Sequence, residues 1–211
     1  GSVGEVYGRH QRKELKLKKY YQSVNSGVQE LCEVLQTYKD KFPRWVEDNK
    51  YHDLCLTDDI DSLLSCIYLN QIKGYNINYF YTFDKIYMTN QANPKDVIAV
   101  DADFTKNKIK CWGNHVTMIN PHDTYNSNCA NINVIDKISR QNYFNKYCGS
   151  TVLQIMSYYD IPLPDSELAK MILLAIDSTF AGYYSKYEND NKANKYYLCE
   201  VLQFEELYNI L

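Results

Sequence analysis

The sequence predicts an α/β fold, with an open and mainly parallel sheet that is flanked by helices and preceded by N-terminal helices. Short runs of β-forming apolar residues recur through the middle of the chain. Longer stretches with a helical spacing of apolar residues separate these runs. Acidic residues follow several of the runs, where an open parallel sheet presents the carboxyl ends of its strands.

The composition is that of a chain able to bury one substantial core. It has 211 residues, of which 45% are apolar. No apolar run approaches the roughly 18 residues that cross a bilayer, and the N-terminus lacks a basic-then-apolar signal pattern. We therefore expect no membrane partner and a cytoplasmic location. Gly1 and Ser2 resemble the scar left by tag removal.

Cysteine usage and charge exclude two classes of site. The seven cysteines are scattered and form no C-x-x-C pair, which favours reduced thiols and argues against structural zinc. A net charge of −3 argues against a broad nucleic-acid-binding surface. The one cationic cluster, Arg9 to Lys19, is more typical of a solvated helix face. The 21 tyrosines are spread through the chain, which favours the margin of the core over base stacking.

The first half of the chain predicts a leading helical segment over residues 1–50 and the opening of a βαβ unit. Apolar positions recur mostly at helical intervals from Arg12 to Val46, which predicts one or two helices. The run from Asp53 to Thr57 predicts a buried strand that stops at an acidic cluster. A helix that ends at Gly74 follows.

An α/β domain is expected to extend over residues 51–185. Three further strands are predicted at Asn76–Thr82, Asp96–Val100 and Lys108–Trp112. The segment from Asn120 to Asn133 is rich in Asn, Pro and Ser and predicts a loop.

Two helices and a tail complete the expected order. The helices are predicted at Gly149–Tyr159 and Ser166–Ile176, on either side of a turn with two prolines. Residues 186–211 are interpreted as a polar linker, from Tyr187 to Tyr197, and a short terminal helix. This tail is interpreted as the possible start of a missing or reduced C-terminal domain.

Acidic side chains and one histidine lie where ligands bind in open parallel sheets. Clustered carboxylates repel one another unless cations neutralise them, so the pattern predicts hard divalent ions. Oxygen ligands with one imidazole suit Mn²⁺ or Mg²⁺ better than Zn²⁺. Two such ions, about 3.5 to 4 Å apart, would promote hydrolysis of a phosphoester or phosphoanhydride. The residues that follow the predicted strands are Asp58, Asp59 and Asp61, then Asp101 and Asp103, then His115.

Each of these residues also has a purely structural interpretation. Aspartates that follow strands commonly form turns or cap helices. Asp58 and Asp59 can cap the helix beginning near Ile60, and Asp165 can cap the helix near Leu168. A single histidine after a strand, such as His115, is often a hydrogen-bonded turn residue. The metal hypothesis therefore depends on the joint placement of the group.

Several segments together resemble the DHH phosphoesterase family, which includes RecJ-type exonucleases, nanoRNases, cyclic-dinucleotide phosphodiesterases and manganese pyrophosphatases. The similarity runs from about Leu54 to Ser178, with the motifs in family order. The segments that carry it are Leu56-Thr57-Asp58-Asp59-Ile60-Asp61-Ser62-Leu63-Leu64-Ser65, Val97-Ile98-Ala99-Val100-Asp101, Gly113-Asn114-His115-Val116, Cys148-Gly149-Ser150-Thr151-Val152-Leu153 and Met171-Ile172-Leu173-Leu174-Ala175-Ile176-Asp177-Ser178.

The resemblance implies a set of site residues and an activity. Asp59 and Asp61 would hold metals, Asp101 would bridge them, and His115 and Asp177 would complete the second site. His115 would also take part in catalysis. The implied function is a divalent-metal-dependent phosphoesterase with one or two Mn²⁺ or Mg²⁺ ions. Its substrate would be a short nucleotide or single-stranded nucleic acid.

The chain departs from the family pattern in three places. Thr57 or Cys55 stands where the first motif usually has a His or Asp, and both are poor Mn²⁺ ligands. The third motif keeps the metal-binding His if it is aligned as Asn114-His115-Val116, and only the second His if it is aligned one residue earlier. Only about thirty residues follow Ser178, fewer than the usual substrate-binding domain needs.

These departures leave alternatives open. One is a catalytically degenerate DHH-fold module that binds a nucleotide or a protein partner without hydrolysis. A flavodoxin-like or Rossmann-like binding module is disfavoured because no G-x-G-x-x-G follows the first strand.

Overall fold

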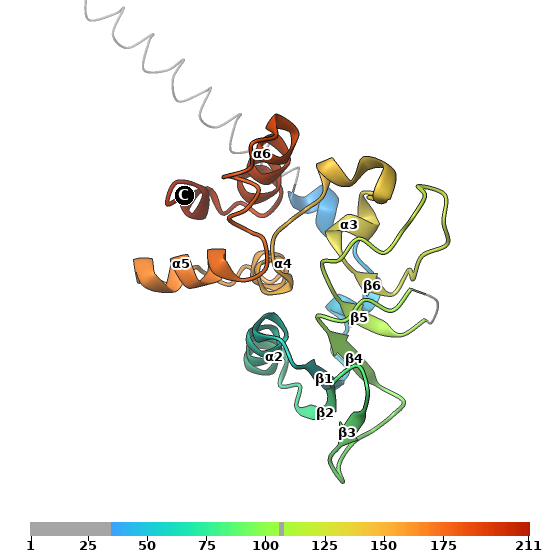
Figure 1. Ribbon diagram of the computed structural model, residues 1–211. Coiled ribbons are helices and arrows are strands. Elements are labelled where there is room, and N and C mark those ends of the chain that lie inside the picture. Colours follow the sequence, from blue (N-terminus) through green and yellow to red (C-terminus); the bar gives the residue numbers. More distant parts are fainter. Residues whose placement is uncertain (1–34, 106–107) are drawn as a thin grey trace, which may run out of the picture.

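The computed structural model describes residues 35–105 and 108–211 and confirms the α/β fold. A six-stranded, mostly parallel sheet is flanked by helices (Figure 1). The basic run from Arg9 to Lys19 and most of the predicted leading helices lie outside the described residues. Within them, residues 35–39 are helical, and the 3-10 helix η1 (Arg44–Glu47) follows.

The sheet has the strand order β3-β2-β1-β4-β5-β6. Every neighbouring pair is parallel except β2 and β3. The chain leaves β1 for β2 and β3 on one side and returns to the other side of β1 for β4. The crevice between β1 and β4 is therefore the topological switch point, where ligands bind in such sheets. The strands are β1 (Asp53–Thr57), β2 (Ile77–Tyr81), β3 (Ile86–Met88), β4 (Val97–Val100), β5 (Lys110–Trp112) and β6 (Cys129–Ala130).

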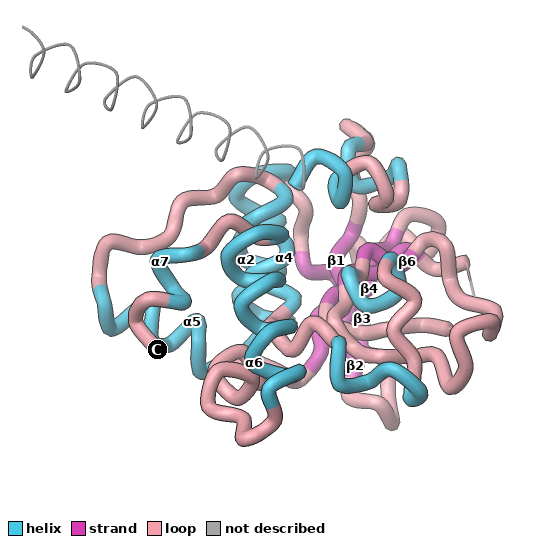
Figure 2. Tube along the Cα trace, turned by 90° about the horizontal axis from the view of Figure 1, so that it is seen from above, coloured by secondary structure: helices cyan, strands magenta, loops and turns pink. Residues whose placement is uncertain are grey.

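The helices pack mainly on one face of the sheet. Figure 2 shows α2, α4, α5 and α6 gathered on one side of the strands, with much of the loop structure on the other. The predicted bounds of α2, α4 and α5 agree with the structure to within two residues. The helices are α2 (Ile60–Lys73), α3 (Ile132–Ile135), the 3-10 helix η2 (Arg140–Asn145), α4 (Thr151–Tyr158), α5 (Glu167–Ala175), α6 (Glu188–Lys195), the π-helix η3 (Tyr196–Val201) and α7 (Glu205–Tyr208).

The ends of two helices illustrate how local chemistry sets their bounds. Gly74 ends α2 with a left-handed φ of 70°, a conformation that glycine adopts without a steric penalty. At α5 the prediction of an Asp165 cap was wrong. The N-cap is Ser166, because its hydroxyl directly precedes the first turn and accepts the N–H of Ala169.

The two faces of the sheet bury side chains of different size. On β4, Ile98 and Val100 pack towards α2 and α4 in a cluster that includes Leu54 and Trp112. Ala99, between them, belongs to a smaller cluster on the other face. This alternation follows from the two-residue period of a strand, and the larger face is the one that the helices cover.

The interpretation of Tyr187–Tyr197 as a polar linker was wrong. Residues 188–195 form α6, and η3 continues from it without a break. The polar residues of α6 lie mostly at the surface, whereas Tyr197, Leu198 and Val201 of η3 are buried with α4 and α5 in the largest hydrophobic cluster. Their apolar spacing is helical, so the tail helps to complete the core of the α/β domain. Among the described residues, no helix has the length and apolar character needed to cross a membrane.

Candidate metal centre

Three of the five predicted metal ligands converge at the switch point. Asp61 lies in the first turn of α2, Asp101 directly follows β4, and Asp177 follows α5. Each offers a carboxylate oxygen such that the three atoms lie within 4.8 Å of one another. Two oxygens on one ion are about 3 to 5 Å apart when metal–oxygen distances are about 2.1 to 2.5 Å. The three carboxylates are therefore close enough to hold one metal ion.

A buried serine sets the position of α2 relative to the strands. The hydroxyl of Ser62 accepts the N–H of Thr57 at 2.9 Å and donates to the carbonyl of Val100 at 2.7 Å. These bonds tie the first turn of α2 to the carboxyl ends of β1 and β4. Asp61, one residue earlier, is thereby held beside Asp101.

Asp61 also contacts the beginning of α4. Its two carboxylate oxygens accept the N–H groups of Thr151 at 2.7 Å and Val152 at 2.8 Å. These amides belong to the first turn of a helix, whose positive dipole end favours a carboxylate. Asp61 is fully buried by this contact. Its side chain therefore joins α2 to α4 as well as facing the other two carboxylates.

Asp101 and Asp177 both have a backbone conformation that is uncommon for residues other than glycine. Their φ angles are 57° and 53°, in the left-handed region, which Asp tolerates better than most residues. The hydroxyl of Thr151 donates to Asp101 at 2.8 Å.

The carboxylates of the cluster oppose one another's ionisation. Burial raises the pKa of Asp61 to about 9, with further increases from the charges of Asp101 and Asp177 and an opposing effect of the Thr151 and Val152 amides. Burial likewise raises the pKa of Asp101 to about 6, while its bond from Thr151 lowers it and the charge of Asp177 raises it. A cation between them would remove the cause of both repulsions.

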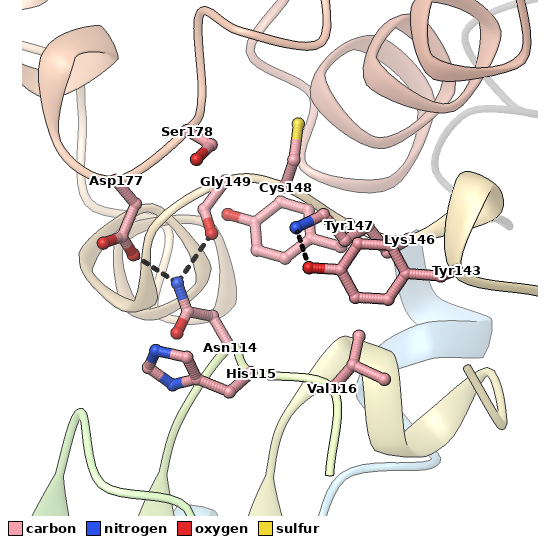
Figure 3. A pocket seen from close by; sticks show the side chains of 10 residues that line it. All are labelled: Asn114, His115, Val116, Tyr143, Lys146, Tyr147, Cys148, Gly149, Asp177 and Ser178. Carbon is pink, nitrogen blue, oxygen red and sulfur yellow. Dashed lines mark hydrogen bonds between the residues drawn. The ribbon is translucent and has the colours of Figure 1, made fainter. Parts of the chain in front are cut away.

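Asn114 contacts the carboxylate cluster, although it was not among the site residues predicted from the sequence. Its side-chain amide donates to Asp177 and, at 2.9 Å, to the carbonyl of Gly149, as Figure 3 shows. Its Oδ1 atom is buried and has no hydrogen-bond partner. A buried amide oxygen without a partner costs about 1 to 3 kcal/mol. The amide nitrogen of Asn114 thus orients the Asp177 carboxylate, while its Oδ1 points away from that contact (Figure 3).

His115, which was predicted as a metal ligand, lies beside Asn114 but is not part of the three-carboxylate group (Figure 3). Its Nδ1 is 2.8 Å from the carboxylate of Asp103, which also accepts the backbone N–H of His115 at 3.1 Å. The bond to Asp103 is the main cause that raises the pKa of His115 to about 9, with smaller contributions from Asp101 and Asp177. The imidazolium form is therefore favoured at neutral pH.

The side chain of Asp103 is buried and is hydrogen-bonded from several sides. It accepts the side-chain N–H of Asn131 at 2.8 Å and the Cys129 thiol at 3.1 Å. A Cβ atom at Gly113 would lie 2.0 Å from its carboxylate, so glycine is required for this approach. The sequence placed Asp103 after the β4 strand without assigning it to the site. Its position two residues after Asp101 is the sequence feature that could have identified it as part of the site.

Two residues of the expected first site do not join the cluster. Asp59 is exposed and its carboxylate accepts the N–H of Asp61 at 2.9 Å, which makes it the N-cap of α2. Thr57 is buried, and its hydroxyl has no hydrogen-bond partner. Among the described residues, only the Asp61, Asp101 and Asp177 group has the spacing of a metal site.

A small cavity opens beside the cluster. It has a volume of about 130 Å³, and its lining includes Asn114, His115, Lys146 and Asp177 (Figure 3). This combination of an imidazole, an ammonium group and a carboxylate lies next to the buried Asp61 and Asp101. Comparisons of the chain with protein-family models, with curated proteins and with solved structures find no match.

Proposed function

We propose that the protein is a divalent-metal-dependent phosphoesterase that hydrolyses phosphodiester bonds in short nucleotides or single-stranded nucleic acid. The observation that carries this proposal is the convergence of Asp61, Asp101 and Asp177 at the switch point of the sheet. We further propose that the chain is a divergent relative of the DHH phosphoesterases, on the motifs described above.

The three carboxylates would hold one Mn²⁺ or Mg²⁺ ion. All the offered donors are oxygens, which hard divalent cations prefer and which zinc sites rarely use alone. When bound, such an ion supplies Lewis-acid polarisation of a phosphoryl oxygen.

His115 would serve as the proton donor of the reaction. Asp103 holds its Nδ1, which leaves Nε2 available for a substrate. The raised pKa keeps a proton on the ring at neutral pH, as a general acid needs. As a water oxygen bonds to the phosphorus and the bond to the leaving oxygen breaks, transfer of that proton to the leaving oxygen would produce a neutral alcohol and leave His115 neutral.

A second candidate function is metal-dependent nucleotide binding without hydrolysis. It is favoured by Asp59, which caps α2, and by Thr57, which stands in place of a stronger ligand. Among the described residues, ligands would then remain for one of the two expected metal ions, the one held by Asp61, Asp101 and Asp177. Both candidates require the same three carboxylates, so turnover is what separates them.

The test compares the wild-type protein with Asp101→Asn in Mn²⁺. For the wild type we expect an Mn²⁺-dependent rise in melting temperature and hydrolysis of a short oligonucleotide, both of which EDTA abolishes. Asp101→Asn should lose both, because it removes one of three charged ligands. Without metal, the variant should be at least as stable as the wild type at pH 8, since the substitution removes a buried charge that repels Asp61 and Asp177.

The matched control is Asp84→Asn, an exposed aspartate in the turn between β2 and β3. It should bind Mn²⁺ and react like the wild type. Hydrolysis that survives EDTA or Asp101→Asn would contradict the proposed mechanism. Mn²⁺ binding without turnover would favour the second candidate.

A further inference from the structure

A second cavity adjoins the one beside Asp177. Its volume is about 370 Å³, within the roughly 300 to 1,000 Å³ of small-molecule sites. The two cavities share four lining residues, so together they form one continuous depression that leads away from the metal centre. The shared residues are Tyr143, Lys146, Cys148 and Ser178.

Aromatic rings from two separate segments line this second cavity. Tyr143 and Phe144 come from η2, and Tyr187 comes from the residue that precedes α6. These side chains are 48%, 49% and 61% exposed, respectively. They differ from tyrosines such as Tyr147 and Tyr197, which are buried in the core. Exposed rings gathered around one cavity are typical of a site that stacks flat ligands.

A positive charge lies at the junction of the two cavities. Lys146 donates to the hydroxyl of Tyr143 at 2.7 Å, and its Nζ lies 4.3 Å from the centre of that ring. Within residues 35–105 and 108–211, no carboxylate forms an ion pair with Lys146. An anionic group that bridges the two cavities would therefore meet an uncompensated ammonium group on one side and the metal centre on the other.

We propose that the second cavity is a nucleobase subsite, in which a base stacks on Phe144 and Tyr187 while its phosphate lies beside Lys146. This inference rests on the proposed function, because it takes the phosphate to be the group that reaches Asp61, Asp101 and Asp177. The recognised chemistry is an aromatic base joined to a phosphate. A mononucleotide and the terminal nucleotide of a single strand both present it.

The order of features along the depression favours this occupant over an apolar peptide. Phe144 and Tyr187 line only the second cavity, together with Asp190, whereas Lys146 lines both cavities and Asp177 lines only the first. A nucleotide has the same sequence of groups, an aromatic base followed by an anion. Stacking on aromatic side chains also tolerates any base, so the subsite would set a preference for nucleotides over other phosphoesters without selecting a sequence.

The experiment measures binding of adenosine, AMP and ribose 5-phosphate to the full chain by calorimetry in Mn²⁺. We expect AMP to bind at least about tenfold more tightly than ribose 5-phosphate, which lacks the base. Phe144→Leu and Tyr187→Leu should each remove most of that preference and weaken adenosine binding about tenfold. Binding of ribose 5-phosphate should stay unchanged in both variants.

The matched controls are Phe83→Leu and Tyr87→Leu. Both residues are exposed to a comparable degree, at 66% and 54%, and lie in or beside the edge strand β3. They should leave all three affinities unchanged. A dinucleotide that binds more tightly than AMP would identify the terminal nucleotide of a strand as the ligand, whereas equal affinities would identify a mononucleotide.

Failure of the subsite and failure of the metal centre give different results. If AMP and ribose 5-phosphate bind equally, or if adenosine binding survives in Phe144→Leu and Tyr187→Leu, the subsite is contradicted. The metal centre is still supported in that case when EDTA or Asp101→Asn weakens the binding of ribose 5-phosphate. If Asp101→Asn binds adenosine as the wild type does, and the two aromatic variants still lose it, the subsite is supported even when no Mn²⁺ effect is seen.

Discussion

At the scale of single residues, Asp61 couples the metal centre to the fold. Its carboxylate accepts two amides of α4 while it faces Asp101 and Asp177. The pKa of Asp61 is raised in the folded state, so the folded protein is destabilised relative to the unfolded chain as pH rises above the unfolded-state pKa of about 4. This destabilisation grows until the pH reaches about 9. Bound cations would offset it, so metal binding should stabilise the fold most at neutral and higher pH.

The pair of His115 and Asp103 leads to a prediction about titration. We expect the pKa of His115, measured by NMR, to be about 9 in the metal-free protein. Asp103→Asn should return it towards the ordinary value of about 6.5, because the variant removes the main cause of the shift. Since the folded-state pKa is raised, the stability that protonation of His115 contributes is complete below about 6.5 and is lost as pH rises through about 9.

A second histidine provides the control for that titration. His52 is buried and packs edge to face against Tyr75. It directly precedes β1, at the end of the strand away from the carboxylate cluster, and burial lowers its pKa. Its titration should be the same in the wild type and in Asp103→Asn. A His115 pKa near 6.5 in the wild type, or one that Asp103→Asn leaves unchanged, would show that Asp103 does not hold the imidazolium form.

At the scale of elements, the sequence predicted best the helices and strands whose bounds are set by local residue patterns. Apolar periodicity located β1, α2, α4 and α5, and the parallel-sheet rule placed Asp61 and Asp101 at one edge. The strand β6 was missed because two residues are too few for a period to be recognised. The strand β3 was missed because its three apolar residues are all exposed and show no alternation of buried and exposed positions.

The parts of the site that escaped prediction depend on tertiary contacts. Asp59 and Asp61 look equivalent in the sequence, yet one caps α2 and the other accepts amides from α4, ninety residues later. The bond from Asn114 to Asp177 and the approach of Asp103 to Gly113 likewise join separate segments. No pattern in a single segment contains such information.

The connection between α2 and the strands predicts a large effect of one hydroxyl. Ser62→Ala should destabilise the protein by about 2 kcal/mol or more, because the Thr57 amide loses its buried acceptor and Val100 loses a donor. The measurement is the free energy of unfolding in urea.

Ser65→Ala is the control on the same helix. Ser65 is equally buried but makes only a 3.4 Å contact with Asp61, so its removal should cost clearly less. Equal losses would contradict the role given to Ser62.

At the scale of the whole molecule, two hydrophobic clusters join into one core. One cluster lies between the sheet and the helices, and the other joins α4 and α5 to the C-terminal residues. Phe42 and Tyr68 pack against both clusters. Leu207, in α7, is fully buried in the second cluster. The C-terminal segment therefore contributes to the packing that holds α4 beside Asp61.

A substitution at Leu207 tests whether the two clusters unfold together. Leu207→Ala should lower the free energy of unfolding by about 2 to 5 kcal/mol, because it leaves a cavity in the core. Leu168→Ala, at an exposed position of α5, should change it by less than about 0.5 kcal/mol. If the clusters form one cooperative unit, unfolding followed by tryptophan fluorescence at Trp45 and Trp112, in the first cluster, should shift together with far-ultraviolet circular dichroism. A fluorescence transition that stays in place while the dichroism transition moves would show that the C-terminal segment unfolds independently of the sheet.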